Sequence, residues 1–599
     1  MDNFTKDTME YINDNNINEE YSLEKSKDDK YIIKINKDGK KIYLGSKYNV
    51  QRDIEEFLKG LEDITPQSII IVFGLGAGEH IIELLKRLEE SNKVLIIEPD
   101  INVVNRFLQI EYSKELISDE RISLCLCEED KVETFLNTYI NSLTIRTSIK
   151  IIKFSNYDKI YRKEIINAFS SIKKFIEKSL VNNSTNKSFS ELFTKAFVNN
   201  LYHIAEATPI NYFKNIFKDK PAIVVSAGPS LEKNVHILKE SQNEFIIITG
   251  ARSLGTLIKN DIVPDFICMV DPCDLNLKFI EDYLDYNIPL VFFESTSYKA
   301  LDLHKGEKIF FTGNTIIHNL LQYDVEDLLT GGSVAHTCTS FALHLGCNPI
   351  TFIGQDFAYT GEKFHADSSA FRKENQINCS DEYIVVKDVY GYPVKTSWIL
   401  NFYKNNMEEI IEKYKDKVFI DSTEGGAYMK ATEVYTLKYT IDKYGIEQIN
   451  KEKIREIFDR SARIGKYNIL KYLQQSEKSL RDINIKVDRG FEYSKEIYLS
   501  YKIGKKIDID NINKKLDIIG QFIEKNREET MIINFLIFKI LEDVLCNPEY
   551  MISSKDSERE RGIKIAEKSM KLYKGIGDKI KEVMPLLKIA IDKLKEEKE

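Results

Sequence analysis

The chain has 599 residues, of which 43% are apolar and 30% are charged. A single hydrophobic core rarely grows beyond about 250 to 300 residues, so this length predicts a globular protein of several domains. The 85 basic and 94 acidic side chains leave a formal net charge of −9, which argues against nucleic acid as a partner.

The N-terminal residues and the cysteines predict a cytoplasmic protein. Residues 1–10 contain no cationic segment followed by an apolar one, so no secretory signal is expected. No apolar run reaches the length of about 18 residues that spans a bilayer, and we expect no membrane partner. The eight cysteines include no C-x-x-C pair, which suits a reducing compartment and gives no zinc signature.

The region up to residue 180 is predicted to be a Rossmann-like domain. Lys37-Asp38-Gly39 lies between the apolar stretches 31–36 and 40–44, which is the pattern of a β-hairpin. Beyond it, strand-like and helix-like segments alternate, and this βαβ pattern predicts a parallel sheet. The four expected strands span residues 68–73, 93–98, 122–127 and 148–154.

A second βαβ series predicts a central α/β domain at residues 190–435. Residues 155–218, which lead into it, read as helical with a break expected at the polar stretch 182–188. A hairpin is expected at 383–395, around Gly391. Most of the expected strands are continuous apolar runs, typical of strands buried on both faces. They span residues 221–227, 244–250, 265–271, 289–294, 308–313, 349–354 and 417–421.

The last part of the chain, residues 440–599, is rich in Lys, Glu, Ile and Leu and poor in Gly, which predicts a helical C-terminal domain. The expected fold class is therefore α/β, with two Rossmann-like parallel-sheet domains at 1–180 and 190–435 followed by an all-helical domain.

The first glycine-rich loop, FGLGAGEH at 73–80, follows a strand and opens a helix. Its glycines would let a ligand approach the backbone closely, and a helix N-terminus favours an anion. Glu98 ends the next strand, 20 residues after Gly78, which is the usual place for an acid that binds a ribose. Two interpretations stay open: a cofactor site, or a tight turn that is kept without a cofactor.

The central βαβ series contains two further glycine-containing loops that each precede a helix. VVSAGPSLEKN at 224–234 places Gly228, Pro229 and Ser230 between a buried strand and a helix. TGGSV at 330–334 places Gly332 and Ser333 before another helix, whose free N–H groups would suit a phosphate or carboxylate. The alternatives are an ordinary strand-to-helix turn and a capped core helix. His336 and His344 of that helix are expected to pack in it.

Polar residues follow several strands of the central series. In open α/β sheets, ligands bind beyond the carboxyl ends of the strands, so these residues are expected at a common edge. They are Gly250, Arg252, Asp271, Asp274, Gln355, Asp356 and Glu424. A sugar-nucleotide site, a metal site built from three of the aspartates (Asp271, Asp274 and Asp356), and plain solvated loops are the three interpretations. His365, in a polar loop after that edge, could serve as a general base.

In order and spacing, these motifs resemble the central domain of the motility-associated factor (Maf) flagellin glycosyltransferases, a domain of the MptE-like type. The stretches that carry the resemblance are SAGPSL (226–231), GAR (250–252), GGSVAHT (331–337), FIGQDFAYTG (352–361), HAD (365–367) and STEGGAYMKA (422–431). The series is more distantly similar to bacterial sialyltransferases that use CMP-sialic acid, in which the nucleotide-binding loop AGNGPSL is longer than the AGPSL of this chain.

The resemblance implies an inverting transfer of a nonulosonic acid, of the pseudaminic or legionaminic type, from a CMP-activated donor to Ser or Thr of flagellin. It implies His365 as the base and Asp356 as a second catalytic candidate. It implies donor contacts for Gly228, Pro229, Ser230, Gly250, Arg252, Asp271, Gly332, Ser333, Gln355 and Glu424. No cofactor or metal is expected, because the nonulosonate already carries a carboxylate.

Other functions remain compatible with the sequence. The loop at 73–80 with Glu98 would suit a methyltransferase that uses S-adenosylmethionine, and the helical tail would suit a flagellin-binding chaperone without catalysis. A related branch of the central domain includes an archaeal pterin diphosphokinase, so the domain alone does not fix the reaction.

Overall fold

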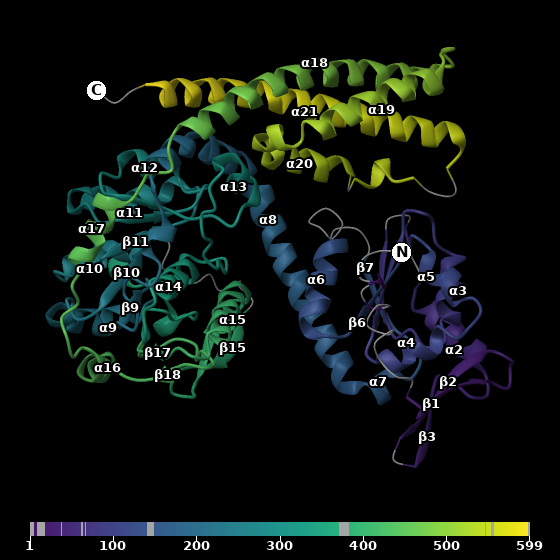
Figure 1. Ribbon diagram of the computed structural model, residues 1–599, viewed down its shortest axis with the longest axis horizontal. Helices are drawn as coiled ribbons and strands as arrows, with labels where there is room; N and C mark the ends of the chain where they lie inside the picture. The colour runs from purple at the N-terminus through teal and green to yellow at the C-terminus, as the bar shows by residue number, and fades with distance from the viewer. Residues whose placement is uncertain are drawn as a thin grey trace. The chain divides into compact units, whose positions relative to one another are not determined.

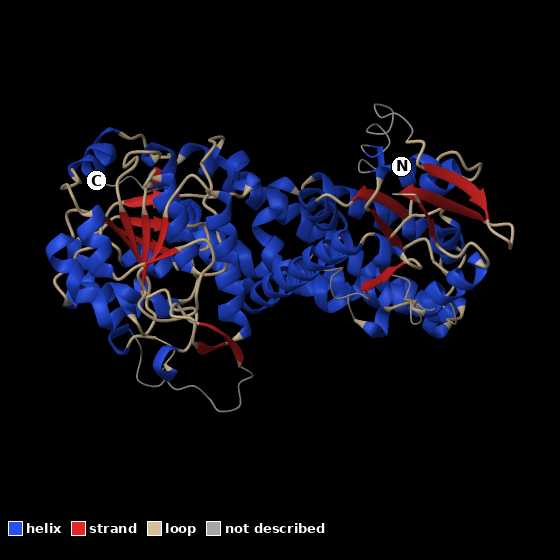
Figure 2. Cartoon of the chain, turned by 90° about the horizontal axis from the view of Figure 1, so that it is seen from below, coloured by secondary structure: helices blue, strands red, loops and turns tan. Residues whose placement is uncertain are grey.

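The computed structural model describes residues 5, 6, 8, 18–37, 39–61, 64–65, 68–140, 149–363, 365–369, 383–545, 547–552 and 556–596. The chain divides into two compact units (Figure 1). The N-terminal unit comprises residues 1–190, 486–519 and 537–577, and the central unit comprises residues 191–485, 520–536 and 578–599. Each unit contains a parallel sheet with helices packed beside it, and antiparallel strands lie at the edge of each unit (Figure 2).

The N-terminal unit contains two sheets. An antiparallel sheet is formed by β1 (Tyr21–Lys25), β2 (Tyr31–Lys37) and β3 (Lys40–Leu44), so the expected hairpin is confirmed, and β1 is an addition to it. The second sheet is parallel, and its strands are those predicted. In spatial order they are β6 (Ile122–Leu126), β5 (Lys93–Glu98), β4 (Ile69–Phe73) and β7 (Ile149–Lys153).

Apolar faces of helices complete the core of this unit. The helix α2 begins after Asn49, whose side chain accepts a hydrogen bond from the N–H of Arg52, and it buries Ile54 and Phe57. The helices of this unit are α2 (Val50–Lys59), α3 (Glu79–Leu85), α4 (Ile101–Phe107), α5 (Ser113–Ser118), α6 (Glu129–Tyr139) and α7 (Tyr157–Ile160).

The central unit is built on a nine-stranded parallel sheet, as the apolar runs predicted. Its longer strands are buried along their whole length because both faces are covered. In spatial order they are β18 (Glu433–Val434), β17 (Phe419–Asp421), β14 (Ile350–Ile353), β9 (Ala222–Val225), β10 (Ile246–Gly250), β11 (Phe266–Met269), β12 (Leu290–Phe292), β13 (Lys308–Phe310) and β8 (Thr208–Pro209). The short edge strands β8 and β18 were not expected.

The strand order fixes where a ligand can bind. From β9 the chain adds β10 to β13 on one side and β14 and β17 on the other, so the order reverses between β9 and β14. A crevice opens at such a switch point, beyond the carboxyl ends of the strands. The helices that surround the sheet are α9 (Leu231–Asn234), α10 (Ala251–Lys259), α11 (Leu277–Ile280), α12 (Tyr298–Leu303), α13 (Thr315–Leu321), α14 (Val334–His344), α15 (Trp398–Lys413), α16 (Leu437–Tyr444) and α17 (Glu452–Arg460).

The expected hairpin around Gly391 is confirmed. β15 (Ile384–Lys387) pairs with β16 (Pro393–Thr396) in antiparallel register. Ser397 follows β16 and caps α15, since its side chain accepts a hydrogen bond from the N–H of Leu400 at 3.2 Å.

Long helices make up the rest of the chain, and the helical nature of the C-terminal region is confirmed. They are α18 (Tyr467–Ile503), α19 (Ile509–Lys525), α20 (Asn534–Leu545) and α21 (Glu558–Lys595). The limits of the three predicted domains stay a prediction. In the part of the chain that is described, no helix combines the length and the apolarity that crossing a membrane requires.

The break expected at residues 182–188 is wrong. The helix α8 runs from Arg162 to Glu206 without interruption, through the polar stretch. Asn, Ser and Thr each disfavour a helix by less than about 1 kcal/mol relative to Ala, and flanking turns sustain the helix across them.

Candidate active site

A cavity of about 450 Å³ lies at the switch point of the central sheet, a volume that suits a nucleotide-sized ligand. Its walls come from loops at the carboxyl ends of β9, β10, β11 and β14, and from the first residues of α10 and α14. Segments distant in sequence therefore meet there, as the strand-end rule predicted.

The loop after β9 is locked to the loop after β14. The N–H of Gly228 donates to the carbonyl of Gly354 at 2.7 Å. The hydroxyl of Ser230 donates to the carboxylate of Asp356 at 2.6 Å, and its N–H points to the same carboxylate at 3.2 Å. Burial raises the pKa of Asp356, while the hydrogen bonds from Ser230 oppose that rise. Asp356, the second catalytic candidate, thus anchors the loop after β9 at the edge of the cavity.

Two helix N-termini form part of the cavity wall. α14 begins after Ser333, whose hydroxyl accepts from the N–H of Ala335 at 3.4 Å, and α10 begins directly after Gly250. The partial positive charge of these helix ends favours an anionic ligand. Gly332 adopts a φ of +89°, and a Cβ there would lie 2.8 Å from the Tyr403 ring, so only glycine fits.

Arg252 and Asp271 contribute opposite charges to the same cavity. The guanidinium of Arg252 lies 4.5 Å from the centre of the Phe279 ring, which orients it. Asp271 remains accessible to solvent in the cavity, although protein surrounds it closely. These surroundings raise the pKa of Asp271, and Arg252 opposes the rise. The cavity therefore offers both a cationic hydrogen-bond donor and an acid.

The imidazole of His365 lines the cavity, and the backbone next to it is fixed. The N–H of Ala366 donates to the carbonyl of Ala227 at 3.0 Å, so the loop that carries His365 lies against the loop after β9. The predicted base thus shares one cavity with the predicted phosphate-binding loops.

The two other histidines of this region are packed, as expected. His336 is buried, and its ring nitrogens lie 3.1 Å from the carbonyl of Ser333 and 2.9 Å from that of Tyr403. His344 lies 2.9 Å from the carbonyl of Ile210. Burial lowers the pKa of both side chains.

The cavity brings together nine of the twelve predicted site residues, which are Gly228, Gly250, Arg252, Asp271, Gly332, Ser333, Gln355, Asp356 and His365. Pro229, Ser230 and Glu424 lie outside its wall. The Glu424 carboxylate accepts from the side-chain amide of Asn234 and from the N–H of Leu437, each at 3.1 Å. Glu424 therefore supports the loop after β17, and its predicted contact with a donor has no direct geometric support.

The metal interpretation of the strand-end aspartates finds no support. Asp274 forms an ion pair with Lys299 at 2.5 Å, away from Asp356, which binds Ser230. Over the described ranges of the chain, no three His, Cys, Asp or Glu side chains form a group that could hold a metal ion.

Several residues of the cavity carried no sequence signal. Tyr403, on α15, closes the wall over the start of α14, although it lies 70 residues from Ser333 in sequence. Phe357 adopts a φ of +46°, which is rare for a bulky side chain and indicates a strained backbone at the cavity wall. The hydroxyl of Ser226 donates to the Gln355 side chain at 2.5 Å and orients it. The strand-end rule could have predicted Ser226, because it directly follows β9.

In the N-terminal unit, side chains of the same unit bind the backbone N–H groups of the first glycine-rich loop. The Glu98 carboxylate accepts from the N–H of Leu75 at 2.7 Å and from the hydroxyl of Tyr157 at 2.8 Å. The N–H of Gly76 donates to the same hydroxyl at 2.8 Å. Burial raises the pKa of Glu98 to about 8. The hydrogen bonds from Leu75, Tyr157 and Asp100 oppose this rise. Glu98 therefore holds the loop and is not placed to bind a ribose.

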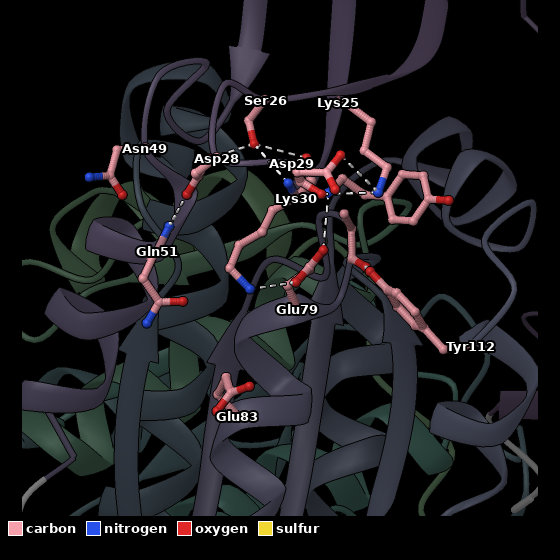
Figure 3. Close-up of polar contacts among 12 residues, drawn as sticks. Lys25, Ser26, Asp28, Asp29, Lys30, Asn49, Gln51, Glu79, Glu83 and Tyr112 are labelled. Atoms are coloured by element: carbon pink, nitrogen blue, oxygen red, sulfur yellow. Dashed lines mark hydrogen bonds and ion pairs between the residues drawn. The ribbon is translucent and has the colours of Figure 1, made fainter.

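The helix that follows this loop already has an anion at its first turn. Glu79, the first residue of α3, accepts from the ammonium of Lys30 and from the N–H of Tyr31, both at 3.0 Å (Figure 3). Figure 3 also shows Asp28 accepting from the N–H of Gln51, in the first turn of α2, so the turn between β1 and β2 is held to α2 as well as to α3. Together with Tyr157, these contacts favour the interpretation of a tight turn without a cofactor over that of a methyltransferase site.

Comparisons with known proteins match the part of the chain that forms the cavity. A family model described as 6-hydroxymethylpterin diphosphokinase MptE-like matches residues 195–362, the stretch that contains most of the cavity. The chain is 23% identical over 218 residues to a 6-hydroxymethyl-7,8-dihydropterin pyrophosphokinase of Methanocaldococcus jannaschii, with 35% of this chain and 86% of the relative covered.

A solved structure is similar over nearly the whole chain. The Maf glycosyltransferase from Magnetospirillum magneticum AMB-1 has a TM-score of 0.58 and 12% sequence identity, with 99% of this chain and 96% of that chain covered. The resemblance expected from the motifs is thus confirmed at the level of the fold: this chain has the architecture of a Maf glycosyltransferase, with an MptE-like segment at its centre.

Proposed function

We propose that this protein is a glycosyltransferase that transfers a nonulosonic acid from a CMP-activated donor to Ser or Thr hydroxyls of flagellin, in the cytoplasm. The observation that carries the proposal is the cavity at the switch point. It joins two helix N-termini and a glycine loop, which suit a nucleotide phosphate, to a histidine that can accept a proton. The likeness in fold to a Maf glycosyltransferase supports the same activity.

Different residues of the cavity serve different steps of an inverting transfer. The neutral imidazole of His365 accepts the proton of the acceptor hydroxyl as its oxygen forms a bond to the anomeric carbon of the donor. The bond from that carbon to the phosphate oxygen breaks, and CMP leaves with the electron pair. The helix ends at Gly250 and Ser333, with the Arg252 guanidinium, stabilise the charge on the leaving phosphate.

The other polar residues position the donor. Asp271 and Gln355 offer an acid and an amide toward sugar or ribose hydroxyls. Asp356 acts as a positioning residue, because its carboxylate holds the loop of Gly228 and Ser230 in place. Because the Ser230 hydroxyl and N–H already occupy this carboxylate, we assign the proton transfer to His365.

The named activity of the archaeal relative suggests a second candidate, diphosphate transfer to a pterin, in which the same loops would hold a nucleotide triphosphate. Such transfers commonly use magnesium held by carboxylates. The likeness in fold to the Maf glycosyltransferase extends over 99% of this chain, whereas the archaeal relative covers 35% of it, so we favour glycosyl transfer.

The proposal is tested in two steps with the full chain. Thermal unfolding is first measured with CMP, AMP, GMP and ATP, because a ligand of the folded state raises the melting temperature by mass action. We expect a rise with CMP that exceeds the rise with the other three. Purified protein is then incubated with CMP-pseudaminic or CMP-legionaminic acid and flagellin, and the flagellin is weighed by mass spectrometry. No shift at millimolar CMP, or an equal shift with all four nucleotides, contradicts the proposal.

A further inference from the structure

The loop from Gly331 to Val334 carries two backbone N–H groups without a partner beside the cavity. Gly332, Ser333 and Val334 line the cavity, whereas Gly331 does not. Among the residues that the structure describes, no backbone or side-chain acceptor meets the N–H of Gly332 or that of Val334. Val334 is the first residue of α14, so the helix provides no acceptor for its N–H either. Two such donors suit a phosphate oxygen, provided that both point toward it.

The side chain of Asn406 sets the direction of the first of these N–H groups. Its amide, on α15, donates to the carbonyl of Gly331 at 2.8 Å. The peptide bond that follows Gly331 is trans, so its C=O and the N–H of Gly332 lie on opposite sides of one rigid unit. Asn406 does not line the cavity and Gly332 does. Because Asn406 holds the carbonyl, the N–H of Gly332 is turned toward the cavity.

His336 supports the same loop through its ring. A Cβ at residue 331 would lie 2.3 Å from the imidazole, so the ring packs directly against the backbone of Gly331. The ring nitrogens lie 3.1 Å from the carbonyl of Ser333 and 2.9 Å from that of Tyr403. The Ser333 carbonyl also accepts from the backbone N–H of His336 at 3.0 Å. The next peptide unit, which carries the N–H of Val334, is therefore fixed as well.

The helix α15, which carries Asn406, is anchored before any ligand binds. α14 and α15 lie side by side in the central unit (Figure 1). Lys404 and Glu408 form a buried ion pair at 2.6 Å on α15. The Glu408 carboxylate also accepts from the N–H of Lys430, in the loop after β17, at 3.0 Å. These contacts fix the helix that holds the Gly331 carbonyl.

We propose that Asn406 is a positioning residue for the transfer: it orients the N–H of Gly332 toward the phosphate of the donor, and His336 supports the same loop. This inference rests on the proposed function for the identity of the donor. Neither side chain lines the cavity, so both act through the backbone of residues 331–334. Donors that are oriented in advance stabilise the charge on the leaving phosphate without any reorganisation during the reaction.

The test compares ligands with and without a phosphate on the full chain. Affinities for CMP and cytidine, and for ATP and adenosine, are measured by calorimetry, and the melting temperature of each variant is measured without ligand. Asn406→Leu removes the amide at similar size, and Asn405→Leu, at the exposed neighbour on the same helix, is its control. Asn406→Asp replaces the donor with an acceptor, and Asn405→Asp brings the same charge to the same turn of the helix.

We expect both variants of Asn406 to weaken CMP binding at least about tenfold, because the peptide unit between Gly331 and Gly332 is then free to turn. Cytidine lacks the phosphate and should bind every variant within about twofold of the wild type, as CMP should bind both variants of Asn405. The melting temperature without ligand should fall by no more than about 5 °C. In the transfer assay, kcat at saturating donor should also fall in the Asn406 variants, since the charge on the phosphate grows as CMP leaves.

CMP affinity within about twofold of the wild type in both Asn406 variants would overturn the positioning role. An equal loss of CMP and cytidine binding, or an equal loss in the Asn405 variants, would overturn it too, as would a wild type that binds neither nucleotide more tightly than its nucleoside. If the wild type binds ATP in preference to CMP, and the Asn406 variants lose affinity for ATP but not for adenosine, the positioning role stands and the proposed glycosyl transfer falls.

Discussion

The replacement Gly228→Ala tests how tightly the two loops of the switch point are packed. A Cβ at residue 228 would lie 2.5 Å from the carbonyl oxygen of Gly354 and closer still to the Asp356 carboxylate, whereas real Cβ contacts stay above 3.0 Å. The Gly354 oxygen cannot retreat easily, because it directly follows β14 and accepts the N–H of Gly228. The loop must therefore shift, and the hydrogen bond from Ser230 to Asp356 must lengthen or break.

The expected size of the effect follows from these contacts. Overpacking costs about 1–3 kcal/mol. Loss of a hydrogen bond to a charged group costs about 1.5–3 kcal/mol more. We expect the free energy of unfolding of the central unit to fall by about 3 kcal/mol or more, and its melting temperature to fall on the order of 5 °C or more.

Gly391→Ala is the matched control. Its φ of +88° makes alanine unfavourable, but no atom lies within 4 Å of the added Cβ, so the cost is conformational only, about 1 kcal/mol. Both proteins are unfolded by heat and followed by circular dichroism. Asp356→Ala is added to each, and should reduce the cost of Gly228→Ala while leaving that of Gly391→Ala unchanged. A Gly228→Ala protein that melts within about 1 °C of the wild type would refute the packing of these loops.

Three further predictions concern the cavity and the core of the central unit. His365→Ala should lower transfer by roughly 10²- to 10⁴-fold and leave CMP affinity nearly unchanged, as measured by mass spectrometry and calorimetry; near-normal transfer would make Asp271 the next candidate for the base. Gly332→Val should abolish CMP binding by calorimetry, because its Cβ meets the Tyr403 ring at a φ of +89°, and normal CMP affinity in a folded variant would exclude this loop as the phosphate site. Burial raises the pKa of Glu294 from 4.5 to about 8, so the folded state keeps a proton that the unfolded state loses, and stability should fall as pH rises from 4.5 to 8. In Glu294→Gln, the melting temperature should fall less steeply between pH 4.5 and 8. An unchanged dependence of the melting temperature on pH would contradict the raised pKa of Glu294.

Much of the fold could be predicted because its signals are local. Apolar runs with the length of a strand predicted β4 to β7 and most strands of the central sheet, since parallel strands covered on both faces need apolar residues throughout. The two-residue strands β8 and β18 were missed, because a strand of that length has no periodicity to read.

The site could be predicted only where the chain obeys a general rule. Gly228 and Asp356 follow strands that flank the switch point, and the strand-end rule brings them together without knowledge of any contact. Tyr403 and Phe357 escaped prediction for a different reason. Tyr403 enters the cavity from a helix, and Phe357 owes its place to a backbone conformation that the Thr396 hydroxyl stabilises.

The two glycine loops show why such a motif does not identify a site by itself. One follows β4 and the other follows β9, and each brings backbone N–H groups close to a helix end. In the N-terminal unit those N–H groups meet Glu98 and Tyr157, both fully buried, so side chains of the same unit stand where a ligand would. In the central unit the acid that meets the loop, Asp356, comes from the neighbouring strand and binds Ser230, beyond the turn. The space in front of Ser226 to Gly228 stays a cavity, and that difference separates the two glycine loops.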